Sequence, residues 1–483
     1  MRKRFEAQLT LGSTPIDQII IPTKCRDEFP PFLRAVQHVY MDTDLSEQIY
    51  SLLEKVLCAK KRTGRPGMDL WTVFVLAGAR LCLNADYDRL HYLANMDNLL
   101  RQMLGVHDGI VRGRQFDRQT IIDNVSLLDD QTLVKINDLI VDAGHKLVKK
   151  KETEALRIKV DSFVTEANVH FPTDYNLLWD SGRKCLDILI DLIDLNPTFS
   201  SGWRKLKDWR RRLKNSMLML SRATADRSKN RQTRLKKAAE SYLLIAGQLS
   251  GKLHQIRMSS AISFEEMFLL EQFETFREML DKHIDLVGRR LLKGEKIPHE
   301  EKIFSVFEPW VEWICKGKTH KPVELGKRTL IATDQWHFAV DWCVANRQQD
   351  CELLLATLDR IRARYRLYSG SCDRGFFSKD NVGIMEAFDI KAIIPKKGKR
   401  SLSDLQRESE PEFIKAKGKH SAIESNINEL EHRGLGRCPD KGIKGFHRYV
   451  GLAVIAYNLH RIGRILLEQA RKASASGVRK KAA

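Results

Sequence analysis

The sequence of 483 residues lacks the features of secreted, zinc-binding and membrane-spanning proteins. Its nine cysteines are scattered and none forms a C-x-x-C pair, which argues against a zinc site or a disulfide framework. Such a set is typical of reduced thiols in a cytosol. The basic N-terminus has no apolar core behind it, unlike a signal peptide, and no apolar run approaches the roughly 20 residues of a membrane span. We therefore expect a cytoplasmic protein with no membrane partner.

Acidic residues are too few to balance the basic ones. Lysine and arginine number 82 against 62 aspartates and glutamates, which gives a formal net charge of +20. This excess favours a polyanionic partner, and nucleic acid is the leading candidate. A ribosome-associated or membrane-surface protein would also be basic, so charge alone does not decide the partner. The length allows two to four domains.

The first 150 residues read as a helical domain. A helix over 44–57 is followed by a basic, breaker-rich loop over 60–67 and then by a helix after Asp69 that is apolar nearly all round. Several short helices joined by short loops are typical of helix-turn-helix units, which place a helix in a DNA groove. A small helical bundle with basic loops fits the pattern equally well.

The rest of the chain alternates between strand and helix patterns, with a long helical interruption. Residues 154–164 predict a strand that carries Asp161, and residues 200–300 show helical periodicity almost throughout. A hairpin is predicted next, with strands over 328–333 and 338–344, and further strands are predicted over 367–372 and 390–394. Helices are predicted over 353–364, 421–432 and 446–467. The chain ends in a basic tail over 471–483 that we expect to be disordered.

These patterns predict a mixed α/β domain that is interrupted early by an all-helical insertion. The expected divisions are 1–150 for the helical N-terminal DNA-binding domain, 151–199 for the first part of the α/β domain, 200–320 for the insertion, 321–470 for the remainder of the α/β domain, and 471–483 for the tail.

Three carboxylates stand out by position. Asp161 lies in a predicted strand, Asp373 directly follows another, and Glu424 begins a predicted helix. Taken alone, Asp373 fits a turn aspartate that closes a strand. Together, acids on rigid elements are what two divalent ions require, and Mg²⁺ prefers such oxygen ligands.

Several fragments, in order, resemble bacterial insertion-sequence transposases of the DDE, ribonuclease H-like type, closest to the ISNCY-like group. They are GRPGMDLWTVFVLAGARLCL, VDSFVTEANVHFPTDYNLL, FSVFEPWVEWICKGK, PVELGKR, CDRGFFSKDN and HSAIESNINELEHRGLGRCPDKGIKGFHRYVGLAVIAYNL. The resemblance covers most of the chain. It implies a ribonuclease H-like catalytic domain whose catalytic and metal-binding acids are Asp161, Asp373 and Glu424.

The resemblance also implies an activity and partners. The expected function is binding of the element's terminal inverted repeats, followed by Mg²⁺-dependent 3′-end cleavage and strand transfer with two metal ions, for which Mn²⁺ can substitute. The partners would be double-stranded DNA, both element ends and target, in a homodimer or larger assembly in the bacterial nucleoid. The alternatives are a catalytically inactive DNA-binding relative and a nuclease on the same fold.

The chain departs from the family pattern around the glutamate helix. Many relatives carry a Tyr, an Arg and a Lys at fixed offsets, whereas His420 stands four positions before Glu424 and Glu431 seven after. The Arg and Lys functions would have to come from other basic residues: Lys417, Lys419, Arg374 or Arg433. Rivals for the acids are Glu429 and Glu431 for the third acid and, more weakly, Asp334 as a metal ligand.

Basic residues in the loops, in the insertion and beside the acids are candidates for phosphate contacts. A solvated helix face is the more usual explanation for any single one. The candidates for DNA binding are Arg62, Arg65, Arg112, Arg114, Arg210, Arg211, Arg212, Arg374 and Lys419.

Overall fold

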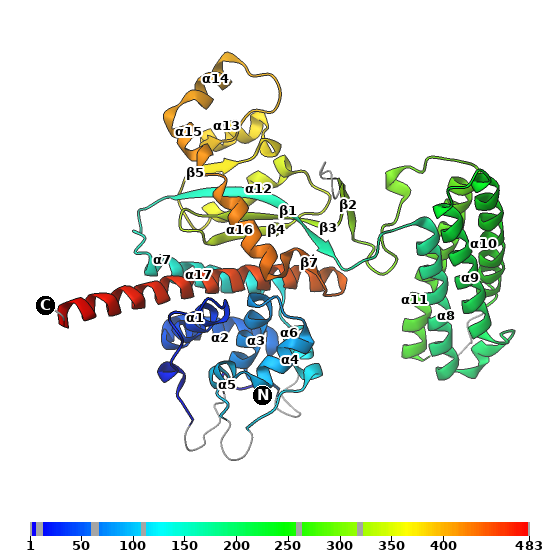
Figure 1. The fold of residues 1–483 in the computed structure, drawn as a ribbon, viewed down its shortest axis with the longest axis horizontal. Coiled ribbons are helices and arrows are strands. Elements are labelled where there is room, and N and C mark those ends of the chain that lie inside the picture. The colour runs from blue at the N-terminus through cyan, green and yellow to red at the C-terminus, as the bar shows by residue number, and fades with distance from the viewer. Residues whose placement is uncertain are drawn as a thin grey trace. The chain divides into compact units, whose positions relative to one another are not determined.

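The computed structural model describes residues 2–5, 13–58, 67–107, 113–256, 263–315 and 322–481. The chain divides into two compact units. One combines Met1–Asn168 with Glu312–Ala483 and holds the sheet, and the other is Val169–Val311. Figure 1 shows the helices and strands of both. Each unit is described by itself.

The sheet is mixed, as the sequence predicts for an α/β domain. β1 forms antiparallel pairs with β3, and β3 with β4, whereas β5 runs parallel to β1 and β6 parallel to β5. Short β2 and β7 pair with β3 and β1. The bounds are β1 (Leu156–Ala167), β2 (Glu312–Cys315), β3 (Val323–Thr333), β4 (Ala339–Val344), β5 (Leu367–Cys372), β6 (Lys391–Ile393) and β7 (Arg437–Cys438).

Helices before and after the strands complete this unit. They are α1 (Phe29–Met41), α2 (Thr43–Leu57), α3 (Leu70–Cys82), α4 (Tyr87–Met96), α5 (Asn98–Met103), α6 (Arg118–Val125), α7 (Asp130–Leu147), α12 (Asp350–Arg362), α13 (Lys379–Ala387), α14 (Leu402–Ser409), α15 (Pro411–Gly418), α16 (Ala422–Leu430) and α17 (Gly442–Lys481). Asp69 caps α3: its Oδ1 accepts a 2.8 Å hydrogen bond from the Thr72 N–H. Every residue of α3 is buried.

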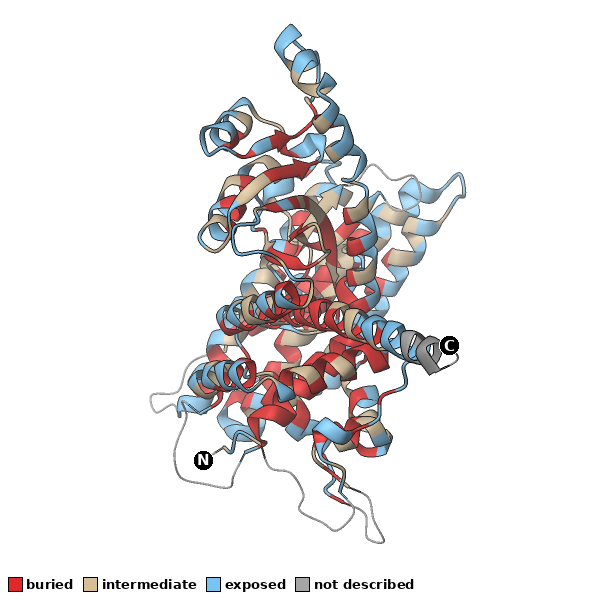
Figure 2. Cartoon of the chain, turned by 90° about the vertical axis from the view of Figure 1, so that its left-hand side faces the viewer, coloured by how far each residue is buried: buried red, intermediate tan, exposed pale blue. Residues whose placement is uncertain are grey.

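Helix α17 is a long helix that contacts several other helices of this unit. It packs against α1, α3 and α7, and its middle section is buried (Figure 2). By length and composition its Gly442–Ser474 part could cross a membrane, whereas the sequence predicts no apolar run of that length. However, 78% of its most apolar window is buried inside the protein, as in the core helix of a soluble protein. The helix continues to Lys481, so residues 471–481 are helical where the sequence predicts a disordered tail.

The second unit is a helical bundle. It contains α8 (Asp174–Leu195), α9 (Leu206–Ala225), α10 (Arg231–Leu253) and α11 (Phe264–Leu291). Leu186, Tyr242 and Leu280 are among the buried side chains at its centre. The expected insertion begins at residue 200, whereas this unit begins at Val169, because α8 packs against α9 and α11.

Candidate active site

Asp161 and Asp373 lie next to each other on the sheet. β1 and β5 are parallel neighbours, and Val160 pairs with Cys372. Side chains alternate between faces along a strand, so the next residues, Asp161 and Asp373, follow in step on the opposite face. Neighbouring strands are about 4.8 Å apart, which puts the two carboxylates within range of the same ion. The structure thus brings together the first two predicted acids.

The two carboxylates differ in their surroundings. Burial is the main cause that raises the pKa of Asp161 to about 6, and the negative charge of Asp373 contributes to that rise. The Ser162 N–H, which donates a 2.7 Å hydrogen bond to Asp161 Oδ1, opposes that rise. Asp373 has 67% of its side chain exposed, and contact with His420 lowers its pKa. One acid is therefore desolvated and the other open to solvent.

His420 approaches this pair from the loop before α16. Its Nε2 lies 3.2 Å from Asp373 Oδ1, which makes an ion pair when the imidazole is protonated. Neither ring nitrogen has a well-aligned hydrogen-bond partner among the described residues. In the sequence, His420 stands out only as a departure from the family pattern, four positions before Glu424.

Glu424, the third predicted acid, lies in the first turn of α16 and is exposed. The helix packs against β1 and β3, and Asn426 Nδ2 donates a 3.0 Å hydrogen bond to Thr333 Oγ1. Ile423, Ile427 and Leu430 form its buried side. No three His, Cys, Asp or Glu side chains in the described ranges are arranged to bind a metal ion. Glu424 is thus on the expected helix but does not complete a three-residue metal site.

The rival third acids differ in their contacts. Glu429 Oε1 lies 3.4 Å from Arg464 Nη1 in an ion pair. Glu431 is exposed and lies beyond the end of α16, in the turn that reaches Leu435. The helix therefore places only Glu424 in its first turn.

The aspartate pair suits a divalent cation. Two neighbouring carboxylates repel each other, and the raised pKa of Asp161 reflects both burial and that repulsion. A hard cation bound by their oxygens would relieve the repulsion, and Mg²⁺ takes such ligands with several waters retained. Asp161 and Asp373 are therefore the residues that fit a metal ion.

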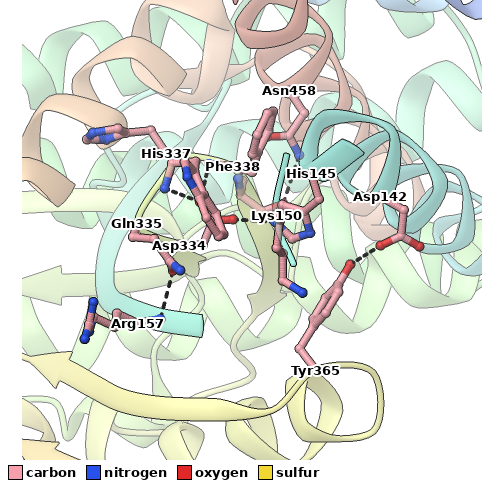
Figure 3. A network of polar contacts seen from close by, with 12 residues as sticks. Asp142, His145, Lys150, Arg157, Asp334, Gln335, His337, Phe338, Tyr365 and Asn458 are labelled. Atoms are coloured by element: carbon pink, nitrogen blue, oxygen red, sulfur yellow. Dashed lines mark hydrogen bonds and ion pairs between the residues drawn. The ribbon is translucent and has the colours of Figure 1, made fainter. Parts of the chain in front are cut away.

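Both carboxylate oxygens of Asp334, the weaker rival for a metal ligand, have hydrogen-bond partners within the fold. It is completely buried, and its Oδ1 accepts hydrogen bonds from the N–H groups of Trp336 and Phe338 at 2.8 and 2.9 Å. Its Oδ2 lies 2.6 Å from His145 Nε2 on α7 (Figure 3). Asp334 therefore connects the β3–β4 turn to α7, and no oxygen is left for a metal.

The candidate DNA-binding residues fall into three groups. Arg62, Arg65 and Arg112 lie outside the described residues. Others have partners within the fold: Arg114 pairs with Asp69 at 3.4 Å, Arg210 with Asp187 at 2.8 Å, Arg211 with Asp208 at 3.0 Å, and Arg212 lies over the Trp209 ring. Arg374 and Lys419 are exposed and are sequence neighbours of Asp373 and His420.

Comparison of the chain with protein-family models, curated protein sequences and solved structures finds no match.

Proposed function

We propose that this chain is a DNA transposase of the DDE type with a ribonuclease H-like catalytic domain. The observation that carries the proposal is the register of β1 and β5, which sets Asp161, in the middle of β1, beside Asp373, at the carboxyl end of the parallel strand β5. Open α/β sheets place their chemistry at that end. The antiparallel pairing of β1 with β3 and of β3 with β4, followed by the parallel strands β5 and β6, also supports a ribonuclease H-like sheet.

Asp161 and Asp373 would hold divalent ions, with Glu424 supplying a further carboxylate from α16. When bound, such ions activate a nucleophile and stabilise the leaving oxygen of an in-line displacement at phosphorus. In the first reaction, water attacks phosphorus and the bond to the 3′ oxygen breaks, which leaves a 3′-hydroxyl at the element end. In the second, that hydroxyl attacks a phosphodiester of the target DNA and displaces its 3′ oxygen.

The chain's own groups around the acids have distinct roles in this proposal. His420 holds the exposed carboxylate of Asp373 through its 3.2 Å contact. Arg374 and Lys419 are exposed cations whose charge attracts the phosphodiester backbone. The net charge of +20 favours a DNA partner in general. A homodimer or larger assembly would bring the two element ends together.

The test is a strand-cleavage assay on DNA that carries the ends of the element encoding this chain. The native chain should cut at the 3′ ends with Mg²⁺ or Mn²⁺, and EDTA should abolish cutting. Asp373→Ala should bind the same DNA without cutting it. Cutting by both proteins would show that the acids are assigned wrongly.

A second candidate is a DNA-binding protein without catalysis. The exposed position of Glu424, outside a three-residue metal site, favours it. Such a protein would bind the element ends equally well with EDTA or as Asp373→Ala. It would cut with neither Mg²⁺ nor Mn²⁺, and Glu424→Gln would leave every measured property unchanged.

A further inference from the structure

A fourth carboxylate, Asp350, lies close to the aspartate pair and was not singled out from the sequence. It is the first residue of α12, just after the N-cap Gln349. Its Oδ1 accepts a 2.7 Å hydrogen bond from Ser162 Oγ and lies 2.9 Å from Arg328 Nη1. The positive end of the α12 dipole adds to the stabilisation of this negative charge.

These contacts connect Asp350 to two neighbouring strands of the sheet, β1 and β3. Ser162 belongs to β1 and directly follows Asp161, and Arg328 belongs to β3. Arg328 is paired with Val164, two residues beyond Ser162, so the two side chains lie on the same face. Because faces alternate, that face is opposite to the face of Asp161.

Asp350 also lies against the turn that follows Asp373. A Cβ atom added to Gly375 would be only 3.3 Å from Asp350 Oδ2. The same turn, Arg374–Phe376, packs against α12. One carboxylate thus contacts the strand that carries Asp161, the neighbouring strand, and the turn that carries Asp373.

We infer that Asp350 is a positioning residue for the proposed metal-binding pair. From the opposite face it fixes β1 and the turn after β5 in one arrangement, and so sets the spacing between the Asp161 and Asp373 carboxylates. It acts through Ser162, Arg328 and the Gly375 backbone, and does not itself bind the ion. The inference rests on the proposed function.

The experiment measures Mn²⁺ affinity of the full chain by electron paramagnetic resonance, with no DNA present. Asp350→Asn keeps the side-chain shape but removes the charge that faces Arg328. Residues that orient metal ligands typically change metal affinity by about 10- to 100-fold when replaced, so we expect Kd to rise at least about 10-fold. Asp161→Asn serves as the benchmark for loss of a direct ligand.

A matched control is Asp341→Asn. Asp341 Oδ2 pairs with Arg360 Nη2 at 2.6 Å and connects β4 to α12, so its loss also weakens helix-to-sheet packing. We expect its Mn²⁺ affinity to stay within about twofold of native, the change typical of a pair without contact to the site. Gly375→Ala is a second variant, because its added methyl group pushes directly against Asp350 Oδ2, and it should weaken Mn²⁺ binding too.

Coupling between Asp350 and Ser162 provides an independent readout. If both act through their shared hydrogen bond, Ser162→Ala should weaken binding, and the double variant should bind no worse than Asp350→Asn alone. Additive effects would overturn the inference. Equal Mn²⁺ affinities for Asp350→Asn and Asp341→Asn would also overturn it. If Asp350→Asn lost Mn²⁺ binding as completely as Asp161→Asn, Asp350 would be a direct ligand, which would overturn the inference as well. A native chain that binds no Mn²⁺ would instead refute the metal site of the proposed function.

Discussion

Two aspartate–histidine pairs in the sheet-containing unit have the same chemistry and different surroundings. In the Asp334–His145 pair the atoms are 2.6 Å apart, Asp334 is fully buried and both its oxygens are used. In the Asp373–His420 pair the distance is 3.2 Å, the aspartate is mostly exposed, and the imidazole lacks well-aligned partners within the described residues. The first pair connects parts of the fold, whereas the second leaves the Asp373 carboxylate open to solvent.

This difference separates structural from functional carboxylates better than sequence position does. Asp334 and Asp373 both follow a strand, at the ends of β3 and β5. What distinguishes them is whether neighbouring N–H groups and a histidine satisfy the oxygens. An acid that the fold leaves partly unsatisfied is the better candidate for a metal or substrate.

Among the acids outside these two pairs, the largest expected effect is at Glu424 in the first turn of α16. Glu424→Gln should reduce strand cleavage by about 100-fold or more, the scale on which loss of one preorganised electrostatic contact acts. The measurement is single-turnover cleavage of element-end DNA with Mg²⁺. Glu429→Gln and Glu431→Gln are the matched controls on the same segment. Equal losses in Glu424→Gln and Glu429→Gln would contradict the choice of Glu424.

In the buried Asp334–His145 pair, Asp334→Ala should lower the free energy of unfolding by about 3 kcal/mol. Removing one partner of a buried pair leaves the other desolvated, together with the N–H groups of Trp336 and Phe338. Urea denaturation measures this change. Mn²⁺ affinity of the folded fraction should not change, and weaker Mn²⁺ binding would make Asp334 part of the site.

Stability of the metal-free chain should depend on pH through Asp161. Its pKa is about 6 in the folded protein against an ordinary 3.8, so folding is disfavoured increasingly as pH rises from 3.8 to 6, and the cost is complete above pH 6. Asp161→Asn should therefore stabilise the metal-free protein by about 2 kcal/mol at pH 8.

The same substitution should have almost no effect near pH 4, because the native carboxyl is then largely protonated. Denaturant midpoints at the two pH values check this. A stabilisation that is equal at both would show that burial of the charge is not its cause.

The smallest effect is expected at His420. Because its partner Asp373 is 67% exposed, their contact adds little stability, and His420→Ala should change the free energy of unfolding by less than about 1 kcal/mol. His145→Ala, in the buried pair, is the comparison and should be clearly destabilising. A similar loss of stability in His420→Ala and His145→Ala would mean that the Asp373–His420 pair is also structural.

The sequence predicts the elements of this unit well, because their signals are local. Strands occur at all five predicted places, and Asp373 follows β5 as expected. The alternation of apolar residues and the turn after Cys372 are sufficient signals to place these strands. The predicted helix over 421–432 corresponds to α16 for the same reason.

Contacts between distant segments could not be predicted. Asp350 meets Ser162 across 188 positions, and His145 meets Asp334 across 189. Such pairs depend on strand register and helix packing, which a single sequence does not show. Helix α8 is similar: its own pattern is clear, but its place with α9 and α11 is decided by packing.

The most direct test of this account compares strand cleavage by Asp373→Asn and Asp334→Asn, at a temperature where both variants are folded. The account predicts that Asp334→Asn cuts element-end DNA at near the native rate, whereas Asp373→Asn binds the DNA and does not cut. Cutting by Asp373→Asn together with loss of cutting by Asp334→Asn would contradict it, because the buried carboxylate would then be the functional one.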